Sequence, residues 1–161
     1  MSGWLKRASQ FVSILFFSAA TVLFLSASGV LAEVQKMSAP EALKALDDGQ
    51  IVLLDIRSPQ EWKQTGVARG AFPITMHNQE FSARLSGVIK ANPDTPIALI
   101  CATGGRTAYV TSVLEKNGVS GIIDVSEGMM GNPSGPGWIA RKLPIVDAKA
   151  AKKAYALAIE N

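Results

Sequence analysis

Short apolar runs alternate with segments of helical spacing along residues 38–161. The apolar runs are almost unbroken, which is typical of strands buried on both faces of a sheet, and they lie at 51–55, 96–100 and 121–125. The segments with helical spacing or a helix-capping start are 39–46, a brief helix from 58, 80–90, 107–116 and 147–161. A weaker strand is predicted at 71–75, and the Gly-, Pro- and Ser-rich stretch 127–137 is predicted to be a loop. This alternation predicts an α/β domain, with an open parallel sheet and helices on both faces.

The first 32 residues differ from the rest of the chain. Their only charges are Lys6 and Arg7, which precede a long apolar run from Phe11 to Leu31. Val30-Leu31-Ala32 then offers the kind of residues at which a signal peptidase cleaves. We therefore predict a signal peptide over residues 1–32 and a folded domain over residues 33–161, which is then periplasmic or secreted.

An uncleaved membrane anchor is the alternative for the same segment. About 20 apolar residues suffice to span a bilayer, whereas the apolar core of a signal peptide is usually shorter, about 7–15 residues. The weakly apolar stretch 26–29 shortens the strongly apolar core to Phe11–Leu25, which favours cleavage. An anchored form would face the periplasm, because the positive end stays in the cytoplasm. A buried helix of the domain is the remaining alternative.

The charge distribution narrows the range of partners. The sequence has 161 residues with 16 basic and 13 acidic side chains, and all the acidic ones lie from Glu33 onward. The folded part is therefore nearly neutral, has the size of one domain, and lacks the clustered basic face that a nucleic-acid binder needs.

The chain has a single cysteine, so no disulfide can form within it. Cys101 directly follows the predicted strand 96–100, and in open α/β sheets ligands bind beyond the carboxyl ends of the strands. The next residues form a loop of small side chains that ends in an arginine: Ala102, Thr103, Gly104, Gly105 and Arg106. Amides of such a loop, together with the amino end of the following helix, favour a thiolate over a thiol.

A thiolate in this loop suits the transfer of one sulfur atom. It would attack a sulfane sulfur, become a persulfide, and give the outer sulfur to a second nucleophile. The anionic intermediate would be held by the loop amides. This chemistry requires no metal and no organic cofactor. An inert, buried cysteine is the alternative reading of Cys101.

The sequence resembles the rhodanese family of sulfurtransferases over residues 34–147. The segment from Cys101 to Arg106 is similar to the family's active-site loop, a cysteine with an arginine five positions on. The other similar pieces, in order, are Asp55-Ile56-Arg57 with Glu61-Trp62, Gly66, Gly70-Ala71, Glu127-Gly128-Met129 and Leu143-Pro144-Ile145. Two features depart from the family's pattern: Gly66-Val67-Ala68 lacks the usual histidine, and the loop at 129–139 is longer than expected.

The resemblance implies a rhodanese-like enzyme that moves a sulfane sulfur through a persulfide on Cys101. The donor would be thiosulfate or a persulfide, and the acceptor a thiol or cyanide. Asp55 and Arg57 are expected to support the site as an ion pair, and Trp138 to pack near it or close over it. His77, the single histidine, is expected at the surface.

Three other functions remain open at this point. The first is a rhodanese-fold binding or sulfur-relay module with little turnover of its own, which would use the 129–139 loop to dock a protein partner. A thiol redox protein is disfavoured by the absence of a resolving cysteine. A phosphatase of related architecture is disfavoured because its loop places five residues, not four, between cysteine and arginine.

Overall fold

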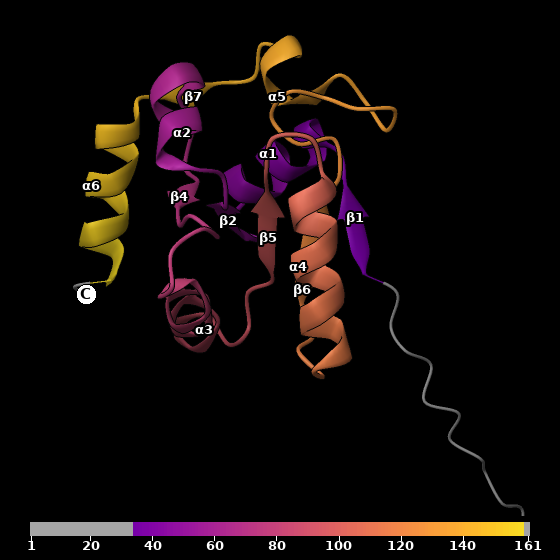
Figure 1. Cartoon of the computed structure of the whole chain (residues 1–161), viewed down its shortest axis with the longest axis vertical. Coiled ribbons are helices and arrows are strands. Elements are labelled where there is room, and N and C mark those ends of the chain that lie inside the picture. The colour runs from indigo at the N-terminus through magenta and orange to yellow at the C-terminus, as the bar shows by residue number, and fades with distance from the viewer. Residues whose placement is uncertain (1–33, 160–161) are drawn as a thin grey trace, which may run out of the picture. The chain divides into compact units, whose positions relative to one another are not determined.

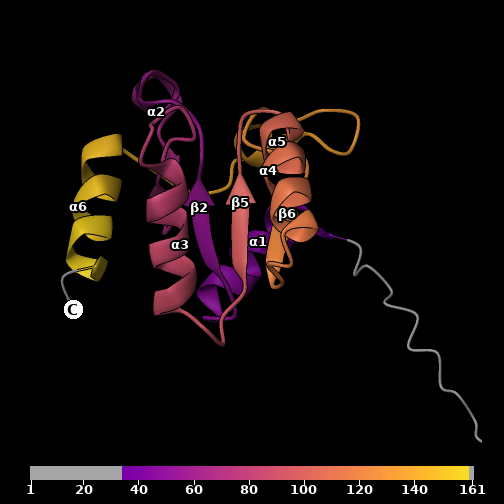
Figure 2. The same cartoon turned by 60° about the horizontal axis from the view of Figure 1, so that its bottom comes forward.

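The computed structural model describes residues 34–159, and the predicted leader over residues 1–32 lies outside the described residues. The central sheet has five strands in the order β1-β6-β5-β2-β4, and each adjacent pair is parallel. In that order the strands are Gln35–Met37, Ile122–Val125, Ile97–Ile100, Val52–Asp55 and Phe72–Pro73. Figure 2 shows β2, β5 and β6 side by side. The predicted parallel sheet is therefore confirmed.

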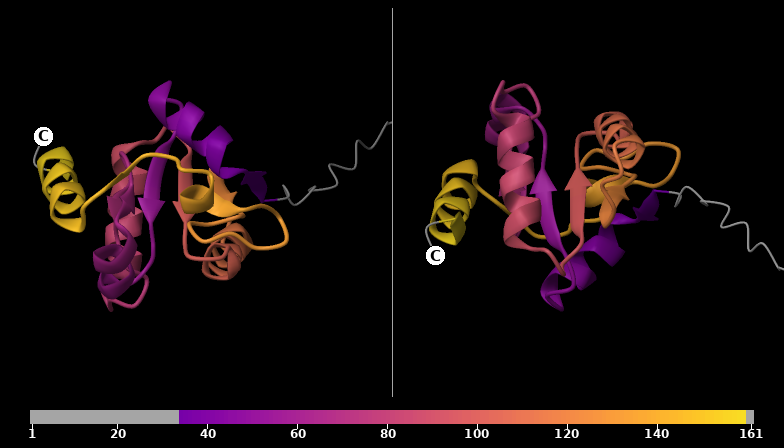
Figure 3. Two further views of the ribbon diagram at one scale, coloured as in Figure 1. Left: turned by 90° about the horizontal axis from the view of Figure 1, so that it is seen from above. Right: turned by 90° about the horizontal axis from the view of Figure 1, so that it is seen from below.

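Six helices surround the sheet within residues 34–159. They are α1 (Ala39–Asp47), α2 (Pro59–Thr65), α3 (Phe81–Ala91), α4 (Gly105–Lys116), α5 (Gly137–Ala140) and α6 (Ala148–Ile159). Seen from above and below, α1 covers one face of the sheet while α3 and α4 cover the other (Figure 3). This confirms the prediction of helices on both faces. In the described part of the chain, every helix is too short or too polar to cross a membrane.

A second, two-stranded sheet joins distant parts of the chain. Strand β3 (Val67–Ala68) pairs antiparallel with β7 (Ile145–Val146), close to α2 in Figure 1. Strands of two residues are too short to show a periodic pattern, so neither they nor the three-residue β1 were predicted. The short helix α5 also begins inside the segment that was expected to be loop.

The sheet divides the core into two clusters, and the alternation along β5 assigns each side chain to one of them. Ala98 and Ile100 pack in the cluster that contains the alanines of α1. Ile97, Leu99 and Cys101 pack in the cluster that contains residues of α3 and α4. Since successive side chains of a strand point to opposite faces, Cys101 continues the α3/α4 side of β5 beyond the end of the strand.

Helices α1 and α2 begin with the same capping motif. Ser38 and Ser58 accept hydrogen bonds from the backbone three residues on, and Glu41 and Glu61 reach back to the two capping residues. This reciprocal arrangement satisfies backbone donors that a helix start leaves unpaired. In α2 the motif also holds Glu61 in place, at a position that matters for the candidate site.

Candidate active site

Cys101 lies at the point where β5 ends and the loop to α4 begins. The residue is 1% exposed, and its nearest apolar neighbours belong to the α3/α4 cluster. It is a free cysteine. The structure therefore places the predicted nucleophile at the carboxyl edge of the parallel sheet, under a cover of protein atoms.

Gly104 allows the loop after Cys101 to turn into α4. Its φ is +82°, in the left-handed region that favours glycine. A Cβ atom at this position would lie 2.2 Å from the backbone oxygen of Ser126, so a larger residue would force the backbone apart. The two consecutive glycines of the sequence thus have different roles, because Gly105 begins α4 and a Cβ atom added there would meet no atom within 4 Å.

The loop carbonyls are fixed from one side by the segment 129–132. The carbonyl of Cys101 accepts from the Met129 amide at 2.8 Å, that of Ala102 from the Met130 amide at 2.8 Å, and that of Thr103 from Asn132 Nδ2 at 2.8 Å. Because C=O and N–H point in opposite directions across a peptide plane, fixing these carbonyls orients the loop amides away from that segment.

The backbone N–H groups of residues 102–107 donate no hydrogen bond to any residue within 34–159. They comprise the loop amides and the first turn of α4, a twelve-residue helix whose amino end carries partial positive charge. Unpaired amides gathered at a helix start form a site that favours anions. This is the arrangement that a thiolate or a persulfide at Cys101 requires.

Thr107 is the polar side chain in contact with the sulfur. Its Oγ1 lies 3.8 Å from Cys101 Sγ, and its hydroxyl donates to the Gly104 carbonyl at 2.8 Å. Thr107 is fully buried. Sequence reasoning missed this residue, although its place directly after Arg106 puts it on the first turn of the helix.

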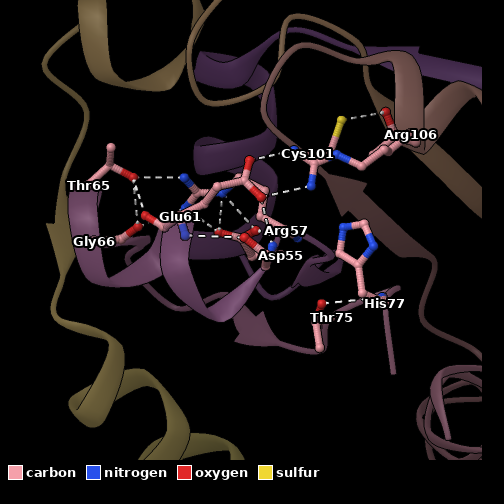
Figure 4. Close-up of polar contacts among 11 residues, drawn as sticks. Asp55, Arg57, Glu61, Thr65, Gly66, Thr75, His77, Cys101 and Arg106 are labelled. Atoms are coloured by element: carbon pink, nitrogen blue, oxygen red, sulfur yellow. Dashed lines mark hydrogen bonds and ion pairs between the residues drawn. The ribbon is translucent and has the colours of Figure 1, made fainter. Parts of the chain in front are cut away.

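Arg106 closes the loop through an ion pair with Glu61 of α2. Two hydrogen bonds join the guanidinium to the carboxylate, the longer at 2.8 Å (Figure 4). The bond from Arg106 lowers the pKa of Glu61 to about 2. The pKa of Arg106 is raised, chiefly by Glu61, and the charge of Cys101 acts in the same direction. Arg106 is therefore oriented by an acid 45 positions away in the sequence.

This pair makes stability depend on acid pH, and Glu61→Gln should remove that dependence. A carboxylate whose folded pKa is depressed stabilises the fold above its unfolded value, near 4.5, and loses that contribution as pH falls toward about 2. We expect the wild type to exceed E61Q in free energy of unfolding by about 1 kcal/mol at neutral pH, since the pair is partly exposed. Urea titrations between neutral pH and pH 2 should show this difference disappear.

The matched control for this experiment is Glu80→Gln, because Glu80 pairs with Arg84 on the surface. It should change stability by less than about 0.5 kcal/mol at any pH. A difference between wild type and E61Q that stayed constant down to pH 2 would contradict the assigned pairing.

Asp55 and Arg57 form a buried ion pair that holds α2 to the sheet. Asp55 is 0% and Arg57 1% exposed, and Arg57 Nη2 lies 2.6 Å from Asp55 Oδ2. The same guanidinium donates to Thr65 Oγ1 at 2.8 Å and to the Gly66 carbonyl at 2.7 Å (Figure 4). These partners shape the end of α2, and Cys101 is not among them. The pair thus supports the α2 segment from which Glu61 reaches Arg106.

Trp138 and His77 lie in different surroundings. Trp138 is fully buried in the α1-side cluster, and its Nε1 donates to the Pro144 carbonyl at 2.9 Å. The structure therefore places it in packing, in the opposite cluster from Cys101, and not as a cover over the sulfur. His77 is exposed, as expected, and lines a polar pocket beside the start of α2.

Glu127, part of the Glu127-Gly128-Met129 piece of the family resemblance, organises the long segment that follows β6. Its carboxylate accepts from the Ala39 amide at 2.9 Å, the Gly137 amide at 2.8 Å and Arg141 Nε at 3.0 Å. Burial acts to raise its pKa, but these three donors more than offset that effect, and the pKa is lowered. The 129–139 loop is thus tied down at both ends, which keeps its amides on the Cys101 loop.

Within residues 34–159, no group of three or more His, Cys, Asp or Glu side chains is arranged to hold a metal ion. The polar groups around Cys101 are the backbone amides of its loop, the hydroxyl of Thr107 and the guanidinium of Arg106. Together with the parallel sheet, they define a single-domain α/β protein with a cysteine at a strand end.

Comparisons with known proteins identify the family to which this α/β protein belongs. The model of the rhodanese-like domain matches residues 38–131, more than half of the chain. The chain therefore belongs to the rhodanese-like domain family, which confirms the resemblance seen in the sequence.

Similar proteins support the same assignment. An uncharacterized protein of Rickettsia prowazekii is 28% identical over 98 residues, which are 57% of this chain and 80% of that protein. The polysulfide-sulfur transferase homodimer of Wolinella succinogenes is 26% identical with a TM-score of 0.53, over 71% of this chain and 79% of that one. A rhodanese-related protein of Thermoplasma volcanium is also 26% identical, with a TM-score of 0.52, over 70% and 97% of the two chains. The chain thus has a sulfurtransferase-type fold.

Proposed function

We propose that this protein is an exported sulfurtransferase that moves a sulfane sulfur through a persulfide on Cys101. The observation that carries the proposal is the set of unpaired amides at residues 102–107 around the only cysteine, closed by Arg106. Such donors stabilise an anionic sulfur without a metal or an organic cofactor. The donor is thiosulfate or a persulfide, and the acceptor is a thiol or cyanide.

The proposed reaction has two displacement steps. The Cys101 thiolate attacks the outer sulfur of the donor, a new S–S bond forms, and the donor's own S–S bond breaks. With thiosulfate, sulfite leaves with the bonding electron pair, and the persulfide keeps one negative charge. The acceptor then attacks the outer sulfur, and the Cys101 thiolate leaves. The loop amides hold the negative charge in both steps.

The experiment that tests this proposal is intact-mass analysis of the protein after incubation with thiosulfate. The wild type should gain one sulfur atom, and cyanide or a thiol should remove it. Cys101→Ser should gain none. Wild-type protein alkylated beforehand is the matched control for sulfur bound elsewhere. Turnover by the Cys101→Ser variant would overturn the proposal.

The burial of Cys101 favours a second candidate, a sulfur-relay or binding module with little independent turnover. A residue that is 1% exposed offers a narrow approach, which suits a donor delivered by a docked protein. In that case the protein would accept sulfur from thiosulfate slowly and from a protein persulfide rapidly. Comparison of the two rates under the same conditions separates the candidates.

We further propose that the domain works in the periplasm or is secreted, with a membrane-anchored form facing the periplasm as the alternative. The sequence of residues 1–32 supports this, with Lys6 and Arg7 before an apolar run and a cleavage-like Val30-Leu31-Ala32. Mass spectrometry of the protein from fractionated host cells would give the mature N-terminus and the compartment. An uncleaved N-terminus in the cytoplasmic fraction would overturn this part of the proposal.

A further inference from the structure

The arginine that ends the Cys101 loop carries a charge that Glu61 already neutralises. Two hydrogen bonds join the Arg106 guanidinium to the Glu61 carboxylate, and both side chains are partly exposed, Arg106 at 26% and Glu61 at 29%. Two parallel N–H donors facing two carboxylate oxygens form the strongest geometry of such a pair. The pair therefore presents no net charge to a molecule that approaches the sulfur.

Glu61 is held in place independently of Arg106. The carboxylate oxygen Oε2 that accepts from Arg106 also accepts from the Ser58 amide, at 2.8 Å. In return, Ser58 Oγ accepts from the Glu61 amide at 3.3 Å. Because this capping box fixes the carboxylate at the start of α2, little side-chain entropy is lost when the acid pairs with the arginine. The pair is thus a built feature of the site.

The other guanidinium at this edge of the sheet is also occupied. Arg57 follows β2 as Cys101 follows β5, and its donors go to Asp55, Thr65 and Gly66. Indeed, every arginine within residues 34–159 forms an ion pair with an acid of the chain. The positive charge closest to the sulfur is therefore that of the loop amides and the start of α4, about half an elementary charge.

Sulfur donors differ in the negative charge that they bring to these amides. When the Cys101 thiolate attacks thiosulfate, a bond to the outer sulfur forms, the S–S bond of the donor breaks, and sulfite leaves with the electron pair. One charge of the thiolate and two of the donor are then gathered in the site. With an organic persulfide anion the same bonds form and break, a thiolate leaves, and the donor brings one charge. Repulsion between like charges in a partly buried site disfavours the first reaction.

We propose that Glu61, by neutralising Arg106, makes this protein select organic persulfides over the thiosulfate dianion as sulfur donors. This inference deepens the proposed sulfurtransferase function and rests on it. Glu61 does not touch the sulfur, so it is a positioning residue that acts through Arg106. Thiosulfate in excess still loads Cys101, but more slowly than a donor with a single charge.

Methanethiosulfonate is a probe of donor charge that matches thiosulfate closely. A methyl group replaces one charged oxygen, the outer sulfur is transferred in the same way, and methanesulfinate leaves in place of sulfite. Intact-mass kinetics give the rate constant for loading Cys101 from each donor. The ratio of the two rate constants cancels any defect that a variant brings to both donors. The wild type should load at least about tenfold faster from methanethiosulfonate than from thiosulfate.

Glu61→Gln should shift this ratio toward thiosulfate by at least about tenfold, because Arg106 then carries an unpaired positive charge. Glutamine can still make the capping contact at the start of α2. Arg106→Gln should shift the ratio the other way, since the charge of Glu61 is then unpaired. The double variant has no charge at either position, like the neutral pair, and its ratio should stay within about threefold of the wild-type ratio.

The matched control is Glu41→Gln. Glu41 occupies the same capping position in α1, where its carboxylate accepts from the backbone and the hydroxyl of Ser38. This variant removes a negative charge and preserves a helix start, as Glu61→Gln does, but it releases no arginine. It should leave the ratio of the two rate constants unchanged.

The dependence on salt tests the wild type without any variant. Loading from thiosulfate should not slow as the salt concentration rises, because no unpaired guanidinium attracts the dianion to the loop. In Glu61→Gln the same reaction should slow, since salt screens the released charge of Arg106. Loading from methanethiosulfonate should respond less in both proteins.

Three results would overturn the inference: a wild type that loads faster from thiosulfate, a wild-type rate with thiosulfate that falls steeply with salt, or a ratio that Glu61→Gln leaves unchanged. In each of these cases Cys101 still takes up sulfur, so the proposed function stands. If neither donor loads Cys101 in the wild type, the proposed function is refuted, and the selection of donors falls with it.

Discussion

Replacing Arg57 by methionine is expected to lower the free energy of unfolding by about 3–5 kcal/mol, because it leaves a buried charge without its partner. Asp55 is fully buried and makes its ion pair with Arg57 Nε and Nη2. The same substitution removes the donors to Thr65 and Gly66, which end helix α2. Urea unfolding followed by circular dichroism measures the loss.

The matched control for Arg57 is Arg69→Met. Arg69 also pairs with an aspartate, Asp47, but both side chains are nearly half exposed. Its loss should cost less than about 1 kcal/mol. The double variant Asp55→Asn, Arg57→Met should recover part of the stability lost in Arg57→Met, since the stranded charge is then removed. Equal effects of the Arg57 and Arg69 variants would contradict the role assigned to burial.

Gly104→Ala is expected to abolish sulfur uptake from thiosulfate and to destabilise the domain as well. The new Cβ would meet the Ser126 backbone oxygen at 2.2 Å, and alanine disfavours a φ of +82°. The loop would have to move away from β6, which would break the hydrogen bonds that fix its carbonyls. We expect at least a tenfold slower uptake and a loss of about 1–3 kcal/mol from backbone strain. Intact-mass kinetics and urea unfolding measure the two effects.

Variants of two other glycines separate the effect of backbone strain from the effect of the clash with Ser126. Gly118→Ala introduces the same kind of backbone strain, with a φ of +75°, but no atom lies within 4 Å of its Cβ. It should destabilise by about 1 kcal/mol and leave sulfur uptake unchanged. Gly105→Ala adds a Cβ in open space beside Gly104 and should be neutral. Normal uptake in Gly104→Ala would show that the loop does not need its observed shape.

The sheet was predictable because its strands are buried on both faces. An uninterrupted apolar run such as 96–100 fits a strand that is buried on both faces of a sheet. The helices between such runs favour parallel pairing of the strands. Strands β1, β3 and β7 were missed because they are two or three residues long and take their conformation from partners far along the chain. Helix α4 begins two residues before the predicted start, since Gly104 and not a polar cap opens it.

The position of Cys101 at a strand end, and of the loop after it, was also predictable, because these residues are contiguous. The groups that act on them come from elsewhere: Glu61 from α2 and Asn132 from the segment that follows β6. No local pattern links these residues, and only the register of the sheet and the path of the chain bring them together. Trp138 was expected near the site because of its position in the sequence. The structure buries it in the cluster on the other side of the sheet from Cys101.

The pairing of β1 with β6 has a consequence for the order in which the domain assembles. Strand β1 pairs only with β6, which is the last strand of the central sheet along the chain. The paired residues Gln35 and Ile123 are 88 positions apart in the sequence. Contacts between such distant positions slow folding, because the intervening chain must be brought together first. At least the first 125 residues must therefore emerge from the ribosome before this edge of the sheet can form.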